Sequence, residues 1–489
     1  MPTLRAGPRA DSCAETPAPA APLAAPRASV HFRSLGCPKN QLDTEVMLGS
    51  LALAGYAIAE RIEDADVAVV NTCSFIESAR EESIEAILEV AGLREEGRLR
   101  ALVVAGCLPQ RFGAELAKEL PEVDAFVGTG SFPAIARILD DALAGRGRGV
   151  YVEAGRTHLY DDASPRVLVG PGHSAYVKIA EGCDRICAFC AIPGIRGRFQ
   201  SRALDSLLRE ARQLAAAGVR ELNLVAQDST SWGKDLPGRP RLADLVRALD
   251  EVEGLDWIRL LYLYPSALDD ALMEAIARAR RVLPYVDVPL QHASDPVLRS
   301  MRRGTTAARQ RRLVERLRAA IPGVTLRTTF IVGFPGETDA DFEALCEFVR
   351  EVRFDRVGVF RYSDEEGTAA FDHAAKVPRA VARARWRRLT ALQRGIMAER
   401  LAAEIGREAD VLVDAVLGRD RALGRLASQA PEIDGVTHLA TGRARLVPGA
   451  LVRARLTGVR GGIDLDAELV AASPARATEH PLASAAAAR

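Results

Sequence analysis

Three closely spaced cysteines near the middle of the chain place the strongest constraint on what this sequence can fold into. Cys183, Cys187 and Cys190 follow the spacing C-x3-C-x2-C and come shortly after a segment of β-type residues at 175–180. A structural zinc site normally closes its coordination with four protein ligands, and the next cysteine, Cys346, lies far down the chain. Three thiolates instead suit a 4Fe–4S cluster whose fourth iron stays open to another ligand.

The alternative is that these three cysteines belong to a hydrophobic core, where free cysteine is common. Gly182, Asp184 and Arg185 interrupt the segment and make it a poor core sequence. We therefore favour a metal-cluster site over a core segment.

The composition fits a globular protein of several domains. The chain has 489 residues, of which 48% are hydrophobic and 27% are charged, so two or three domains are expected. Lys plus Arg and Asp plus Glu both number 65, which excludes a global positive field that would gather nucleic acid. No apolar stretch is long enough to span a membrane, and no membrane association is expected.

The two ends of the chain have little pattern. Residues 1–29 are rich in Ala, Pro and Arg, lack an apolar signal-peptide region and are expected to form a disordered extension. Low complexity predicts a disordered tail at 471–489. The cysteines are spaced as metal ligands rather than disulfide partners, which favours a cytoplasmic location. Cys13, in the extension, and Cys346, on an apolar helix face, are not expected to be ligands.

The first domain, expected at residues 30–146, alternates apolar strands with helices. Strands are predicted at 30–35, 66–71, 101–105 and 125–128, and helices at 40–54 and 77–92. This alternation predicts an α/β fold with a parallel, flavodoxin-like sheet.

Three further cysteines fall just past the ends of successive strands in this domain. Cys37, Cys73 and Cys107 are far apart in the sequence, but the carboxyl ends of parallel strands share one edge of a sheet. Each follows Gly or another small residue, which leaves room for an inorganic ligand. One such cysteine would most simply be a core residue, but three equivalent positions predict a second three-thiolate iron–sulfur site.

A linker rich in Gly, Asp and Pro at 145–172 leads to a central domain expected at 172–390. Helical stretches separate six strand candidates, at 175–180, 222–226, 257–262, 286–290, 326–332 and 357–362. Six β/α units are too few for a complete eightfold barrel.

The run from Cys183 to Cys190 resembles the cysteine motif of the radical S-adenosylmethionine (SAM) enzymes. In that family the open iron binds the amino and carboxylate groups of SAM, and one electron then cleaves SAM to a 5′-deoxyadenosyl radical. The resemblance implies that the six units form a partial (β/α)6 barrel with its chemistry at the carboxyl ends of the strands.

The same resemblance implies a set of SAM-binding residues along that rim. They are Phe189, Gln227, Asp228, Arg327, Thr328, Ile331, Gly333 and Tyr362. In this interpretation the acidic position after the second strand lies near the SAM amino group, Arg327 or Thr328 reaches the carboxylate, and the fifth strand approaches the adenine. Each polar residue taken alone could equally cap a loop. Gln291 and His292 could line the pocket, although a lone histidine is more often structural than catalytic.

The last domain, expected at 391–470, begins with a helix and continues as a β-rich region. Strands are predicted at 410–416, 437–440, 451–456 and 464–469, and a fifth, unplaced strand is needed to close a small barrel. Position and pattern resemble a TRAM domain, an OB-like module often used to bind RNA. Acidic residues offset its arginines, and the acidic loop at 430–435 is expected to repel phosphates.

Two cysteine sets, a partial barrel and a TRAM-like domain together resemble the methylthiotransferases. The segments at 34–40 (SLGCPKN), 190–197 (CAIPGIRG) and 430–435 (APEIDG) are similar to the branch that modifies ribosomal protein S12. The resemblance implies two 4Fe–4S clusters and SAM as cofactors. It implies S12, free or in the 30S subunit, as the partner and flavodoxin or ferredoxin as an electron donor. Nucleic acid would be met only through the ribosome.

The implied mechanism begins with reductive cleavage of SAM at the cluster of the central domain. The radical takes hydrogen from the β-carbon of an S12 aspartate, whose C–H bond is not acidic enough for general-base chemistry. The cluster of the first domain presents sulfur, methylated by a second SAM, to the carbon radical. Six cysteines are thus expected to be both metal ligands and catalytic residues, namely Cys37, Cys73, Cys107, Cys183, Cys187 and Cys190.

Two other functions remain open from the sequence. A tRNA adenosine methylthiotransferase of the same family would show a basic groove across the barrel and the TRAM-like domain. A non-catalytic iron–sulfur electron-transfer protein would have no use for a SAM site. A purely structural zinc protein fits the three-cysteine sets least well.

Overall fold

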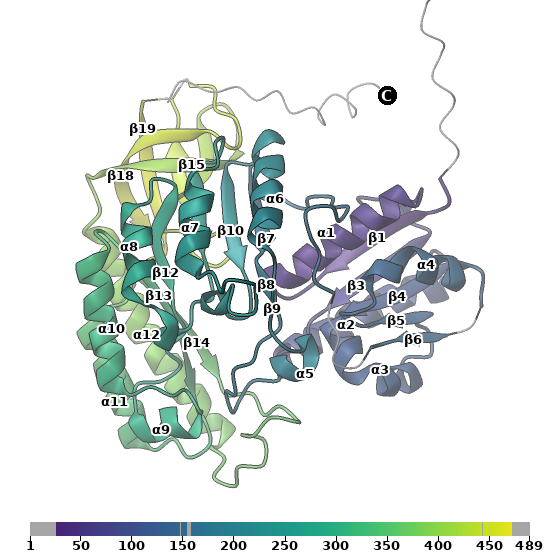
Figure 1. The fold of residues 1–489 in the computed structure, drawn as a ribbon, viewed down its shortest axis with the longest axis horizontal. Coiled ribbons are helices and arrows are strands. Elements are labelled where there is room, and N and C mark those ends of the chain that lie inside the picture. Colours follow the sequence, from purple (N-terminus) through teal and green to yellow (C-terminus); the bar gives the residue numbers. More distant parts are fainter. Residues whose placement is uncertain (1–25, 147, 154–157, 443, 472–489) are drawn as a thin grey trace, which may run out of the picture.

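The computed structural model describes residues 26–146, 148–153, 158–442 and 444–471, which form three folded parts (Figure 1). The extension expected at 1–29 and the tail expected at 471–489 lie almost wholly outside the described residues, as does Cys13. An α/β chain ending in a small β-barrel was the predicted class, and it is confirmed. Within the described ranges, no helix is both long and apolar enough to cross a membrane.

The first part is a parallel six-stranded sheet in the order β2-β1-β3-β4-β5-β6, which confirms the flavodoxin-like topology. Its strands are β1 (Ser29–Ser34), β2 (Ala57–Ile58), β3 (Val67–Thr72), β4 (Ala101–Gly106), β5 (Ala125–Val127) and β6 (Gly149–Tyr151), and its helices are α1 (Pro38–Leu53), α2 (Glu77–Glu95), α3 (Cys107–Glu119) and α4 (Ile135–Leu143). Val69 and Val103 pack on the side of α1 and α4, whereas Val70 and Val104 pack on the side of α2 and α3. The central strands are apolar throughout because both faces of the sheet are covered.

The central part is a second parallel sheet, in the order β14-β13-β12-β11-β10-β7, which curves into the expected partial barrel. Its strands are β7 (Ser174–Lys178), β10 (Glu221–Val225), β11 (Trp257–Leu260), β12 (Val282–Asp287), β13 (Thr325–Val332) and β14 (Arg356–Arg361). The fourth strand was predicted at 286–290, four residues too late. Pro284 hid its start, since proline is rare inside a sheet, and a register shift between β11 and β12 accommodates it.

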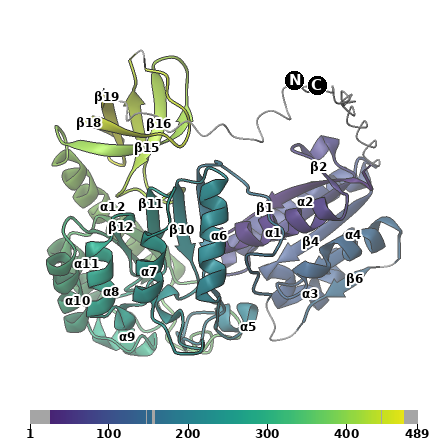
Figure 2. The same ribbon diagram turned by 45° about the horizontal axis from the view of Figure 1, so that its top comes forward.

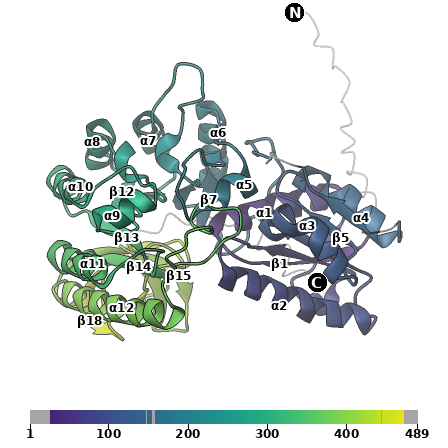
Figure 3. The same ribbon diagram turned by 90° about the horizontal axis from the view of Figure 1, so that it is seen from below.

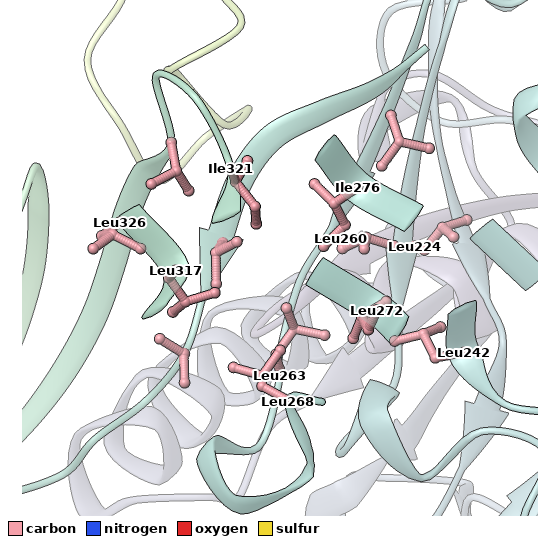
Figure 4. Packing of buried hydrophobic residues seen from close by; sticks show 14 of the residues in the cluster. Leu224, Leu242, Leu260, Leu263, Leu268, Leu272, Ile276, Leu317, Ile321 and Leu326 are labelled. Atoms are coloured by element: carbon pink, nitrogen blue, oxygen red, sulfur yellow. The ribbon is translucent and has the colours of Figure 1, made fainter. Parts of the chain in front are cut away.

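Helices cover the outer face of this sheet, as Figure 2 shows, and pack with it around the largest hydrophobic cluster of the described residues. They are α6 (Leu204–Ala216), α7 (Leu242–Asp250), α8 (Asp270–Arg278), α10 (Ala307–Ala320), α11 (Asp339–Val352) and α12 (Arg379–Ala402), with a shorter α9 (Asp295–Ser300) below them. Figure 4 shows Leu224, Leu260 and Leu326 of the strands meeting Leu272 and Leu317 of the helices. The other face of the sheet, here called the barrel interior, carries larger polar side chains.

The C-terminal part is a closed five-stranded barrel, as predicted, in the order β15-β16-β17-β19-β18. Its strands are β15 (Glu408–Val416), β16 (Arg421–Leu426), β17 (Thr437–Ala440), β18 (Leu451–Arg460) and β19 (Asp464–Ala471). The unplaced strand is β16, whose sequence RALGRL lacks a regular apolar alternation. The expected domain limit at 390 falls inside α12, which runs as one helix from the central part towards the barrel.

All three parts meet around the amino end of the barrel interior. Leu42 of α1, Tyr176 and Tyr285 of the barrel, and Leu412 of the C-terminal part share one buried apolar cluster. The acidic loop at 430–435 lies against it, because the Asp434 side chain is only 2% exposed and accepts a 2.7 Å hydrogen bond from the Tyr285 hydroxyl. This carboxylate therefore holds two domains together instead of facing solvent, where it was expected to repel phosphates.

A buried ion network strengthens the same junction. Glu221 of β10 accepts from Arg425 at 2.7 Å and from Arg259 at 3.2 Å, and Arg425 also contacts Asp414 at 2.9 Å. Burial alone would raise the pKa of Glu221, but the charges of Arg425 and Arg259 outweigh it and lower the pKa to about 2.

Candidate active site

The cysteines of the first domain gather at one edge of its sheet, as the strand pattern predicted. Cys37 precedes α1, Cys73 follows β3 and Cys107 opens α3 directly after β4, and β1, β3 and β4 are neighbours in the sheet. Burial raises the pKa of Cys73 to about 12, and the charges of Cys107 and Cys37 add to the effect. The three thiols are thus close enough to influence one another, and we call them the N-terminal triad.

Gly36 makes the approach of two of these cysteines possible. Its φ of +92° lies in the region that side chains avoid, and a Cβ atom there would stand 2.7 Å from the Cβ of Cys73. The glycine before Cys37 was expected to leave room for an inorganic ligand. The structure shows that it leaves room for Cys73.

The cysteines of the central domain lie in the loop between β8 (Ala180–Glu181) and the short helix α5 (Ile192–Arg196), just past the carboxyl end of β7. Burial raises the pKa of Cys190 to about 12, and the charges of Cys187 and Cys183 raise it further. We call these three residues the barrel triad. No described cysteine forms a disulfide.

Both triads have the donor chemistry of a cube-shaped cluster. In the described part of the chain no three His, Cys, Asp or Glu side chains converge tightly enough to hold one metal ion. In a 4Fe–4S cluster each cysteine binds a different iron, so its ligands surround a larger group than a single ion. Three thiols without a fourth protein ligand fit such a group with one open iron.

Arg196 joins the two triads, although in the sequence only its place in the motif at 190–197 marks it. It is 2% exposed, follows the barrel triad on α5, and donates an N–H to Cys107 Sγ at 3.2 Å. The same guanidinium contacts Asp43 of α1 at 2.7 Å and Glu181 at 3.4 Å. Figure 3 shows α5 beside α1 and α3 of the first domain.

Lys178 completes this buried network. Its ammonium group contacts Asp43 at 2.6 Å and Glu181 at 2.5 Å, so two cations and two carboxylates are balanced at zero net charge. Burial by itself would lower the pKa of Lys178, but the carboxylates of Asp43 and Glu181 raise it above its usual value.

Arg303 plays for the barrel triad the part that Arg196 plays for the N-terminal triad. It is 5% exposed, donates to Cys187 Sγ at 3.2 Å and donates to the Pro289 carbonyl at 2.7 Å. Each triad thus has one buried guanidinium in contact with one of its sulfur atoms. No sequence motif pointed to Arg303.

Three of the residues expected to bind SAM come together beside the barrel triad. Phe189, Ile331 and Tyr362 are partly buried against an apolar cluster that contains Met301 and Phe334. They present an apolar surface of a kind that suits an adenine ring.

Two more expected SAM-binding residues stand at the end of β10. Gln227 donates its amide N–H to Glu181, and its Oε1 is buried without a hydrogen-bond partner among the described residues. Asp228 accepts from Arg185 at 2.7 Å and from Ser231 at 2.8 Å, so protein groups already hold this carboxylate.

The remaining three lie on β13 or directly after it. Arg327 faces the barrel interior and pairs with Asp287 at 2.8 Å, while the Thr328 hydroxyl donates to the Val288 carbonyl at 2.8 Å. Both side chains are therefore engaged within the barrel. Gly333 has a φ of +74°, and a Cβ there would lie 2.5 Å from that of Ala382 on α12.

Gln291 and His292 differ in what they can do. Nδ1 of His292 accepts from the Ser294 N–H at 3.0 Å and Nε2 faces Glu337 at 3.4 Å, an arrangement typical of a structural histidine. Gln291 has a φ of +73°, and its Oε1 is buried with no partner in the described part of the chain. Like the Oε1 of Gln227, it is an unsatisfied polar atom that a bound ligand with N–H groups would satisfy.

The first domain spans the gap between the two edge strands of the barrel. Lys178 of β7 pairs with Asp43 of α1 on one side, and on the other Arg111 of α3 pairs with Glu365, in the loop after β14, at 2.7 Å. Arg80 of α2 contacts the same glutamate. The first domain is therefore attached to the barrel at both of its edge strands.

Comparison with known proteins agrees with this architecture. Family models match at three places: uncharacterized protein family UPF0004 at residues 29–128, the radical SAM superfamily at 177–349, and the TRAM domain at 405–470. A solved radical S-adenosylmethionine methyltransferase, TsrM from Kitasatospora setae with cobalamin and a [4Fe-4S] cluster bound, aligns with a TM-score of 0.52 at 17% identity, covering 70% of this chain and 77% of that one. At this identity the likeness shows the fold alone. Fold, barrel triad and family match define a radical SAM enzyme.

Relatives that match nearly the whole chain show which family of radical SAM enzymes it belongs to. Ribosomal protein uS12 methylthiotransferase RimO from Anaeromyxobacter sp. (strain Fw109-5) is 51% identical over 92% of this chain and 94% of its own length. The proteins of the same name from Sorangium cellulosum and Myxococcus xanthus are 50% and 46% identical, covering 88% and 92% of this chain and 88% and 94% of their own. The chain belongs to the ribosomal protein uS12 methylthiotransferase family.

Proposed function

We propose that this enzyme adds a methylthio group to the β-carbon of an aspartate in ribosomal protein S12. The observation that carries the proposal is the junction at Arg196, where a residue following one thiol triad contacts a cysteine of the other. A transfer that needs both a radical and a sulfur source requires two such centres within reach of one substrate carbon.

We infer that Cys183, Cys187 and Cys190 hold one 4Fe–4S cluster and that the N-terminal triad holds a second. When bound, the first cluster with SAM supplies a radical strong enough to take hydrogen from an unactivated carbon, and the second supplies sulfur. For SAM, the side chains favoured by their positions are Phe189, Ile331 and Tyr362 around the base and Gln227 for a polar group.

The protein's own part is to hold the triads at a short and fixed separation. Only Ala191 lies between Cys190 and α5, and five helical residues advance about 7.5 Å. Arg196, at the end of this helix, is locked by Asp43 and Glu181, so the barrel triad cannot shift without moving α1 and Cys107. Such positioning makes successive steps on one carbon effectively intramolecular.

Burial of half of the six cysteines would help to keep water from a reactive intermediate. Cys73, Cys107 and Cys183 are each at most 8% exposed, and the first domain closes the side of the barrel. We further propose domain limits of 30–146, 172–390 and 391–470, and a small electron-transfer protein such as flavodoxin or ferredoxin as the reductant.

The test is anaerobic reconstitution with iron and sulfide, followed by incubation with reductant, SAM and either S12 or tRNA, and mass spectrometry of both. We expect a methylthio mass gain on an aspartyl peptide of S12. A methylthio gain on tRNA adenosine alone would show that the substrate is tRNA and not S12. Formation of 5′-deoxyadenosine without either product would refute the proposed substrate but support the radical chemistry.

Cysteine variants separate the two centres. Cys73→Ala is expected to lower bound iron from roughly eight atoms per chain to roughly four, to keep SAM cleavage and to abolish methylthio transfer. Cys346→Ala is the matched control, because Cys346 is fully buried on α11 and belongs to neither triad. Loss of SAM cleavage in a folded Cys73→Ala protein that retains its barrel cluster would contradict this division of labour.

A further inference from the structure

Lys39 is a buried ammonium group for which the described residues supply no carboxylate partner. Lys39 is only 7% exposed, and its Nζ lies 3.0 Å from the centre of the Tyr262 ring. Lys178, the other buried lysine among the described residues, is paired with two carboxylates. Since a buried charge is costly unless it is paired, Lys39 is built to receive an anion that the chain itself does not provide.

The surroundings of Lys39 favour an anion further. It is the second residue of α1, whose first turn contains no acidic residue, and the amino end of a helix carries partial positive charge. Cys37, Asp287 and Glu181 are near enough to act on its charge, but none of the three forms a hydrogen bond or ion pair with it in the described structure. A cation held over an aromatic ring keeps its other N–H directions available.

Lys39 also links the sulfur side of the site to the barrel. It stands two residues from Cys37, at most about 7 Å between Cα atoms, and its ring partner Tyr262 lies just past the carboxyl end of β11. Tyr262 has a φ of +62°, which is an uncommon conformation. Its backbone N–H donates a 2.9 Å hydrogen bond to the Asp287 carboxylate, which helps to hold that conformation. The ammonium group therefore sits between the N-terminal triad and the barrel interior.

We propose that the Lys39 ammonium binds the side-chain carboxylate of the aspartate that is modified. This inference rests on the proposed function. The β-carbon of aspartate is bonded directly to that carboxylate, so an ion pair with Lys39 fixes the reacting carbon next to the N-terminal triad. The same contact explains selection of aspartate, because an asparagine at that position would leave the buried charge unpaired.

The experiment measures peptide binding without turnover. The reconstituted enzyme, oxidised and with SAM present, is titrated against a fluorescent S12 peptide containing the target aspartate and against its Asp→Asn twin, by anisotropy. Wild type should prefer the aspartyl peptide by about 10- to 100-fold, the range for a hydrogen bond to a charged group. Lys39→Met should bind both peptides equally weakly, and Lys39→Arg should restore part of the preference.

Lys118→Met is the matched control, since Lys118 is exposed on α3 in the same domain and should keep the full preference. The wild-type comparison of the two peptides needs no variant to fold, and iron content and circular dichroism check the variants. Equal binding of both peptides by wild type, with S12 still modified, would overturn the role of Lys39 alone. A Lys39→Met variant that still prefers the aspartyl peptide would overturn the proposal too. If that variant also fails to bind SAM, Lys39 would instead be assigned to the SAM carboxylate. No peptide binding and no S12 modification would remove the proposed function together with this inference.

Discussion

Replacing Arg196 with methionine is expected to loosen the junction between the first domain and the barrel. The guanidinium is 2% exposed and contacts Asp43 at 2.7 Å, Glu181 at 3.4 Å and Cys107 Sγ at 3.2 Å. Methionine has similar length but no charge. The variant leaves Lys178 alone against two carboxylates, which gives the buried network a net charge of −1.

The magnitude follows from that imbalance. Removing one partner of a buried ion pair costs about 3–5 kcal/mol, because the remaining charge stays in a site with little water. In a cooperative unit of 150–250 residues each kcal/mol lowers the melting temperature by about 2–4 °C, so a fall of about 6–20 °C is expected. Arg196→Lys keeps the charge, but its single ammonium group cannot contact Asp43 and Cys107 together. Its melting temperature should therefore lie between those of wild type and Arg196→Met.

The assay is anaerobic thermal melting of the apoprotein, which removes any contribution of the clusters. The decisive variant is the double substitution Asp43→Asn with Arg196→Met. It restores a neutral network, so it should melt higher than Arg196→Met alone even though Asp43→Asn by itself destabilises the wild type. A double variant that melts lower than Arg196→Met, or a single variant within about 2 °C of wild type, would refute the charge-balance argument.

Three further predictions concern contacts away from Arg196. Arg425 lowers the pKa of Glu221 to about 2 despite the burial of this carboxyl group. Its contribution to folding stability, about 3 kcal/mol, is therefore present above pH 4.5 and lost as the pH falls towards 2. Melting temperatures measured at decreasing pH should show this loss, and Glu221→Gln should make the pH dependence flatter. Gly333→Ala should destabilise the protein by about 1–3 kcal/mol, measured by urea unfolding, because of its φ of +74° and the contact with Ala382; an unchanged midpoint would contradict the geometry. Asp434→Ala should expose the link to the C-terminal barrel to limited proteolysis, and a digestion pattern equal to wild type would count against its anchoring role.

The arrangement of elements was predictable because the pattern that reveals it is local. Apolar strands followed by helices indicated two parallel sheets, and the topology of such sheets predicts that Cys37, Cys73 and Cys107 meet at one edge. The short strands β2 and β6 were missed because two or three residues carry too little pattern. Elements whose sequence departs from their ordinary pattern were misplaced, as Pro284 shows for β12.

The residues that connect the domains were not predictable in the same way. Lys178, Asp43 and Glu181 look like ordinary surface charges in the sequence, and only the docking of α1 against β7 makes them a buried set. Arg303 stands between two loops with no motif to mark it. Of the expected SAM-binding residues, Arg327 proved to be engaged with Asp287, which a single strand pattern could not indicate.

The open form of the barrel gives these connections their importance. A complete eightfold barrel closes its own interior, but six strands leave β7 and β14 as edges. Here the first domain covers that gap with Asp43 at one edge and Arg111 at the other, and the same docking brings Cys107 into contact with Arg196 of the central part. Closure and the placing of the second triad are therefore one structural event. If the ion network at Arg196 is weakened, both should fail together, with water reaching the site as the two triads separate.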